Sequence, residues 1–109
     1  SSKISIIRLP IELNLKELKV HLSGRLIKNE NGIQRMQVST GSGGEVVQTI
    51  HIQDKDSEYI EIRIDSLDID DELILSFRVD DPVSPKLLGL GSDERFIGFE
   101  LHSIEISQV

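Results

Sequence analysis

Apolar residues recur at every second position along most of this chain. The alternation is clearest in Ile60–Ile64 and Leu73–Val79, and it recurs at Ile4 and Ile6, in Leu18–Leu22, at Met36 and Val38, and at Val46 or Val47 with Ile50 and Ile52. This spacing is typical of strands that bury one face. No segment keeps apolar residues at helical spacing over several turns, and Pro85–Leu90 could form one helical turn at most. The pattern therefore predicts an all-β protein.

Polar and glycine-rich segments separate the apolar runs. Gly41–Gly44 and Gln53–Asp56 are typical of turns, and the run Leu18–Leu22 ends at Ser23-Gly24. About eight short strands at regular spacing predict an antiparallel, jelly-roll-like β-sandwich. The length of 109 residues fits a single domain that spans residues 1–109.

The last apolar run changes register. Phe99 and Leu101 share one face, whereas Ile104 and Ile106 share a face only after an odd step. One extra residue would reconcile the two registers, so the sequence predicts a β-bulge near His102-Ser103. Phe99, like Phe77, is in phase with apolar neighbours and is expected in the core.

Composition excludes several classes of function. The chain has 12 Lys and Arg against 19 Asp and Glu, a formal charge of −7, which argues against binding nucleic acid or an anionic membrane face. No cysteine is present, so disulfides, thiolate metal sites and a cysteine nucleophile are excluded. No apolar run is long enough to cross a membrane as a helix. Because residue 1 is serine and a charged, strand-like segment follows, we expect the chain to be excised from a larger protein.

The histidines give little sign of catalysis. His21, His51 and His102 each occupy the outward position of an alternating strand, so we expect them to face solvent. Nucleophilic catalysis needs a base beside the nucleophile, and no glycine-framed serine is present. We therefore expect that this chain is not an enzyme.

Acidic residues gather in one short segment. Asp65, Asp68, Asp70 and Asp71 are followed by Glu72, and Asp80-Asp81 could add further carboxylates. Calcium prefers several oxygen ligands, but the segment lacks the central glycine of a dedicated calcium loop. A solvated acidic turn is the ordinary interpretation, and a structural calcium is the alternative. No other cofactor is expected.

Two segments offer candidate ligand contacts. Tyr59 is out of phase with Ile60 and is therefore the best exposed ring for stacking on a sugar, with Arg63, Glu61 and Gln48 as possible hydrogen-bonding groups. In the segment after Val79, Asp93 can cap a turn while Arg95 pairs with a carboxylate or carbonyl. This segment is expected either to plug one end of the sandwich or to present Asp93 and Arg95 to a ligand or neighbouring domain.

The same segment carries a sequence motif. Pro82–Leu101 contains Pro-x-Ser-Pro-x-x-Leu-Gly, then Ser-Asp-x-Arg-x-x-Gly, then an alternating strand. It resembles the small β-sandwich domain C-terminal to the catalytic domain of membrane-anchored bacterial phosphoglycerol transferases, a module also attached to some cell-surface polysaccharide glycosyltransferases. Ser5–Pro10 and Ser23–Arg25 are similar to the way these domains begin. Phe96-Ile97 departs from the pattern, which has smaller aliphatic residues there.

The resemblance implies an accessory role. The parent enzymes transfer phosphoglycerol from phosphatidylglycerol to periplasmic glucans with a metal-dependent catalytic domain, none of whose catalytic residues lies in this chain. The implied partners are the catalytic domain of the same polypeptide and a glucan or other polysaccharide, on the periplasmic or cell-surface side of the membrane. Two alternatives remain open: a carbohydrate-binding module, stand-alone or attached to a glycosyltransferase, and a structural or adhesive module that dimerises through an edge strand.

Overall fold

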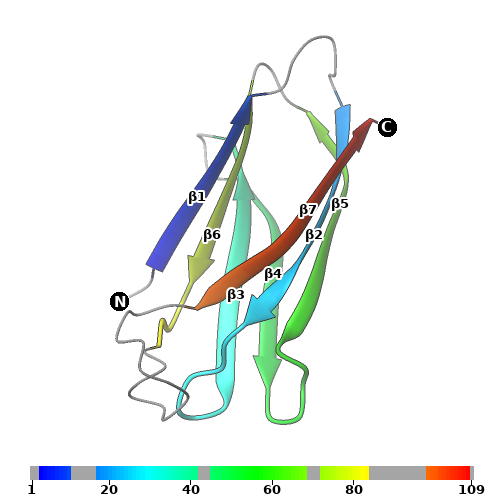
Figure 1. Cartoon of the computed structure of the whole chain (residues 1–109). Coiled ribbons are helices and arrows are strands. Elements are labelled where there is room, and N and C mark those ends of the chain that lie inside the picture. The colour runs from blue at the N-terminus through cyan, green and yellow to red at the C-terminus, as the bar shows by residue number, and fades with distance from the viewer. Residues whose placement is uncertain (1–2, 11–16, 42–44, 69–71, 84–97, 109) are drawn as a thin grey trace.

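Seven strands form two stacked sheets (Figure 1). The computed structural model describes residues 3–10, 17–41, 45–68, 72–83 and 98–108. The strands are β1 (Lys3–Pro10), β2 (Glu17–Leu26), β3 (Ile33–Thr40), β4 (Glu45–Gln53), β5 (Tyr59–Asp68), β6 (Glu72–Val79) and β7 (Phe99–Gln108). The predicted all-β sandwich is confirmed, with seven strands in the described residues where about eight were expected. Pro85–Leu90 lies outside those residues.

The chain passes repeatedly between the two layers. One sheet has the order β1-β6-β3-β4 and the other β5-β2-β7, with every neighbouring pair antiparallel. Only β3 and β4 follow each other within one sheet, a path in keeping with a jelly-roll-like sandwich. β1 and β7 point toward the same end of the sandwich (Figure 1). Among the described residues, no helix is long and apolar enough to span a membrane.

The core fills the space between the layers with alternate residues of each strand. β2 and β5 supply Leu18, Val20, Leu22, Leu26, Ile62 and Ile64; β3, β4 and β6 supply Met36, Val38, Ile52, Leu73, Leu75, Phe77 and Val79. The Phe77 and Phe99 rings meet across the layers, with 5.3 Å between their centroids. Both phenylalanines therefore lie in or against the core, as predicted.

The predicted irregularity in the last strand is confirmed. Ser23 is paired with Ser103 and Gly24 with Leu101, so His102 is the extra residue of a β-bulge in β7. Gly24 lies directly under the neighbouring strand, because a Cβ added there would come 2.7 Å from the Phe99 ring and would also meet the Glu100 carbonyl. The bulge lets Phe99 and Ile104 both face inward on one continuous strand.

In the two edge strands of the four-stranded sheet, β1 and β4, the alternation predicted the wrong buried residues. In β1 the buried side is formed by Ile7 and Leu9, which pack against the core, while Ile4 and Ile6 are exposed. The registry with β6 decides this, because it places Ile7 opposite the buried Leu75. In β4 neither Val46 nor Val47 is buried, since Val47 is the extra residue of another bulge.

A glutamine occupies an inward position of β3. Gln34 is 2% exposed. Its Nε2 donates hydrogen bonds to the carbonyls of Ile27 at 2.9 Å and Asp81 at 2.7 Å, and its Oε1 accepts one from the Asp81 N–H at 3.1 Å. A buried polar group is tolerated when it is hydrogen-bonded in this way. Gln34 thereby ties the β2–β3 connection to the end of β6.

Replacing this glutamine tests its role. We expect Gln34→Leu to lower the free energy of unfolding by about 2 kcal/mol, because backbone groups of Ile27 and Asp81 lose their partners. Urea unfolding measures the change. Gln37→Leu, on the side of the same strand that points away from the core, is the control and is expected to stay within about 0.5 kcal/mol of the parent. Equal losses in both variants would contradict this role.

Candidate functional site

The outward side of the β5-β2-β7 sheet is a grid of polar side chains, here called the outer face. Alternation places every second residue of each strand on it. In cross-strand rows, His21 of the central strand lies between Arg63 of β5 and Glu105 of β7, and Ser23 lies between Glu61 and Ser103. The outer face therefore gathers side chains from three separate parts of the sequence.

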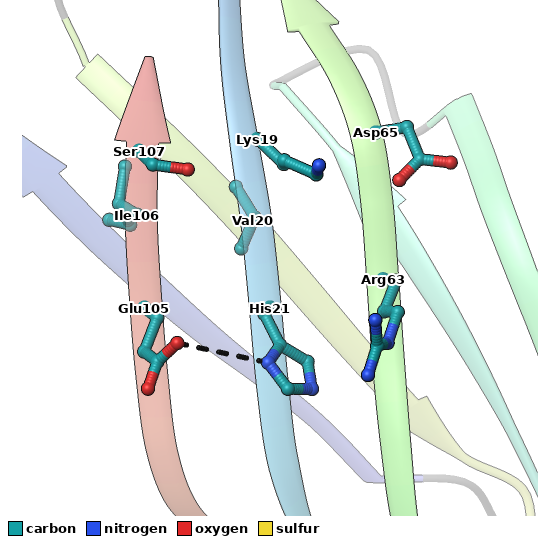
Figure 2. A pocket seen from close by; sticks show the side chains of 8 residues that line it. All are labelled: Lys19, Val20, His21, Arg63, Asp65, Glu105, Ile106 and Ser107. Carbon is teal, nitrogen blue, oxygen red and sulfur yellow. Dashed lines mark ion pairs between the residues drawn. The ribbon is translucent and has the colours of Figure 1, made fainter. Parts of the chain in front are cut away.

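A shallow hollow of about 330 Å³ lies at one end of the outer face. Figure 2 shows Lys19 and His21 projecting from β2 at its centre, with Arg63 and Asp65 on one side and Glu105 and Ser107 on the other. Val20 and Ile106 complete its lining. A register shift in the pairing of β2 with β5, between Leu18 and Val20, adds an extra residue to β5 beside the hollow. Bulges of this kind re-aim side chains and are common next to functional sites.

His21 lies between two carboxylates. Its Nδ1 is 3.9 Å from Glu105 Oε2 and its Nε2 is 3.7 Å from Glu61 Oε1, while Arg63 Nη2 is 3.7 Å from Glu61 Oε2. Within the part of the chain that the structure describes, His21 Nε2 is buried and makes no hydrogen bond. Exposed pairs of this length contribute little to stability. Their main effect is to place donors and acceptors side by side.

Two rings meet at the other end of the outer face. Tyr59 is 69% exposed, and its ring centroid lies 6.1 Å from that of His102, with the planes tilted by 49°. Their strands lie on opposite sides of β2, about 10 Å apart, so the two rings lean toward each other across the central strand. The bulge in β7 thus places His102 beside Tyr59. We call these two residues the ring pair.

A half-buried ion pair supports the base of the ring pair. Arg25 Nη2 lies 3.2 Å from Glu58 Oε1, and Glu58 Oε2 also accepts a 2.8 Å hydrogen bond from the Lys28 N–H. Arg25 is the cross-strand partner of Tyr59. Tyr59 itself donates its backbone N–H to Ser57 Oγ at 3.1 Å. These contacts hold the start of β5 in place and leave the Tyr59 ring exposed beside His102.

The candidate ligand residues divide between the sheets. Tyr59 and Arg63 share the outer face, as their spacing predicted, and the predicted exposure of Tyr59 is confirmed. Gln48 belongs to β4 in the other sheet, so it cannot join them. His51 also lies on β4 and is exposed, as is His102, while His21 is half-buried. Asp93 and Arg95 lie outside the described residues, and their predicted role stays a prediction.

The structure describes only some of the carboxylates of the predicted calcium site. Asp65 is exposed at the hollow; Asp70, Asp71 and the side chain of Asp68 lie outside what the structure describes. Among the described residues, no group of three or more histidines and carboxylates could hold a metal ion. Asp80 and Asp81 follow the far end of β6 from Glu72, where Asp80 pairs with Arg35 at 3.3 Å. They therefore cannot complete a site at the β5–β6 turn.

Sequence reasoning missed most of the hollow. The sequence pattern gives no functional signal for Lys19, Glu105 or Ser107. His21 was expected only to face solvent. The alternation could predict that these side chains point away from the core. It could not predict that β2 lies between β5 and β7. Comparisons of this chain with family models, curated proteins and solved structures found no match. The resemblance to the phosphoglycerol transferase domain therefore stays a prediction.

Proposed function

We propose that this chain is a non-catalytic accessory module that holds a glycan acceptor for the catalytic domain of an envelope enzyme. The observation that carries the proposal is the exposed ring pair on the same sheet face as the hollow. An exposed ring can stack on the apolar face of a sugar, while side-chain donors and acceptors bind its hydroxyl groups. The motif in Pro82–Leu101 supports a phosphoglycerol transferase acting on glucans as the parent enzyme.

The openness of the outer face supports binding rather than catalysis. The side chains of His21, Arg63 and Glu105 are 33%, 68% and 81% exposed. An active site usually closes over its reacting groups and excludes water, which strengthens their electrostatic interactions. Weak binding suffices for an accessory module, because attachment to the enzyme raises the effective concentration of the acceptor.

Chemical-shift mapping with β-glucan oligosaccharides tests the proposal. We expect shifts at Tyr59, His102 and Arg63, and we expect Tyr59→Ala to weaken binding about tenfold through loss of the stacked ring. His51→Ala, which removes an exposed ring from the other sheet, is the control and should bind like the parent. No shift with any oligosaccharide, or equal losses in both variants, would overturn the proposal.

The titration should be repeated with calcium and with a chelator. Calcium-dependent shifts confined to residues 65–72, without any response to sugars, would instead favour a metal-stabilised structural module. That result would move the function away from the outer face. It would also place the acidic segment of the sequence at the centre of the function.

A second candidate function is self-association through an edge of the larger sheet. β1 is at the edge of this sheet and exposes Ile4 at 60% and Ile6 at 54%. Exposed edge strands with apolar residues are templates for pairing with another chain. This observation favours a structural or adhesive module that dimerises.

Sedimentation over a range of concentrations distinguishes this candidate. If β1 forms a dimer interface, the mass should rise with concentration, and Ile6→Lys should shift the dissociation constant at least tenfold by placing a charge in the interface. Ile33→Lys is the matched control, since Ile33 is an exposed isoleucine on the interior strand β3. A monomer at every concentration would remove the candidate.

A further inference from the structure

Carboxylates lie beside the basic and imidazole groups of the outer face. Arg63 is beside Glu61, His21 beside Glu105, and His102 is 3.5 Å from Glu100. The hollow also holds both Lys19 and Asp65. An anionic ligand would meet the carboxylates, and a cationic ligand would meet the basic groups. The complementary ligand is therefore uncharged and rich in groups that both donate and accept hydrogen bonds, as sugar hydroxyls do.

The contact points are spread along the strands. Tyr59 and Arg63 are four residues apart on β5, which at the rise of an extended strand separates them by about 13 Å. Ser23 and Ser103 lie between the ring pair and the hollow, with 2.5 Å between their hydroxyl oxygens. A ligand that reaches both ends must therefore be longer than a single sugar ring and must lie along the strands.

We propose that the outer face binds an extended, uncharged oligosaccharide that runs along β5. One sugar stacks on the ring pair of Tyr59 and His102, and a sugar further along the chain places its hydroxyls in the hollow. There Arg63 donates hydrogen bonds and Glu105 accepts them. This inference rests on the proposed function and deepens it, since it specifies the charge, length and direction of the glycan.

A length series tests the inference. Calorimetric titration would compare neutral β-glucan oligosaccharides from one to six units with oligogalacturonides of the same lengths. We expect at least a tenfold gain in affinity between the single sugar and the longest neutral ligand, and weaker binding of the acidic series. Affinity independent of length, or tighter binding of the acidic series, would overturn the inference while leaving glycan binding intact. Absence of binding to every sugar would overturn the proposed function as well.

Two exposed substitutions locate the ends of the ligand. For the longest neutral ligand, Tyr59→Ala and Arg63→Ala should each weaken binding about tenfold; for the single sugar, only one of them should have an effect. Gln37→Ala, on the outward side of the other sheet, is the matched control. If Arg63→Ala leaves binding of the longest ligand unchanged, the ligand does not reach the hollow and the inference is wrong. Dispersed amide spectra would establish that each variant is folded.

Discussion

Phe77→Ala is expected to lower the free energy of unfolding by about 4 kcal/mol, the cost typical of deleting a buried ring. Phe77 is 3% exposed on β6, and its ring meets that of Phe99 on β7, in the opposite sheet. The two sheets are held together by apolar packing, so a cavity here weakens the contact between them. Small domains have total stabilities of about 5–15 kcal/mol, so this loss removes a large part of the stability of the fold.

Guanidinium unfolding followed by circular dichroism measures this loss through the shift in midpoint. Phe77→Leu is the control, because leucine fills much of the same volume and should cost about 1.5 kcal/mol. Phe99→Ala should cost less than Phe77→Ala, since Phe99 is only half-buried. A loss below about 1.5 kcal/mol for Phe77→Ala would mean that the packing of the sheets does not depend on the contact between Phe77 and Phe99.

Gly24→Ala is expected to cost about 3 kcal/mol, because the added methyl group has no space. Its Cβ would meet the Glu100 carbonyl and approach the Phe99 ring to 2.7 Å. Neither the Glu100 carbonyl nor the Phe99 ring can easily move away. β7 is hydrogen-bonded to β2 along its length, and the Phe99 ring is packed against the core. The substitution therefore forces apart two strands of the sheet that carries the outer face.

Gly32→Ala separates crowding from the general cost of replacing a glycine. Gly32 has a positive φ of 78°, but a Cβ there meets nothing within 4 Å. We expect a loss of about 1 kcal/mol from backbone strain alone. Thermal unfolding of both variants gives the comparison. If Gly24→Ala proves no more destabilising than Gly32→Ala, β7 can move away from β2 more easily than its pairing indicates.

Much of the fold could be predicted because alternation is a local property. The strands and the bulge at His102 were both readable, since Phe99 and Ile104 can face inward together only if one residue is skipped. Alternation failed where two apolar registers compete. β1 contains both Ile4 with Ile6 and Ile7 with Leu9, and the choice between them depends on pairing with a strand more than sixty residues away.

The candidate site likewise has a part that could be predicted from single strands and a part that depends on strand pairing. The exposure of Tyr59 and its shared face with Arg63 follow from positions on one strand. The hollow does not, because His21 and Glu105 become neighbours only through the pairing of β2 with β7. Gln48 was misplaced for the same physical reason: its own sequence neighbourhood carries no sign of which sheet its strand joins. The charges along one strand, and the side of the sheet on which each residue lies, could be predicted from the sequence. The neighbours of each residue on adjacent strands could not.

The placement of the first and last strands has a mechanical consequence. β1 and β7 point toward the same end of the sandwich and lie in different sheets, so the start of β1 and the finish of β7 are separated along the strands (Figure 1). A pulling force applied between Lys3 and Gln108 therefore has a component along the strands. It loads the β1–β6 ladder, from Lys3 opposite Val79 to Pro10 opposite Glu72, in shear, so its hydrogen bonds share the load instead of opening one after another. We therefore expect this ladder to resist extension better than one that opens from a single end.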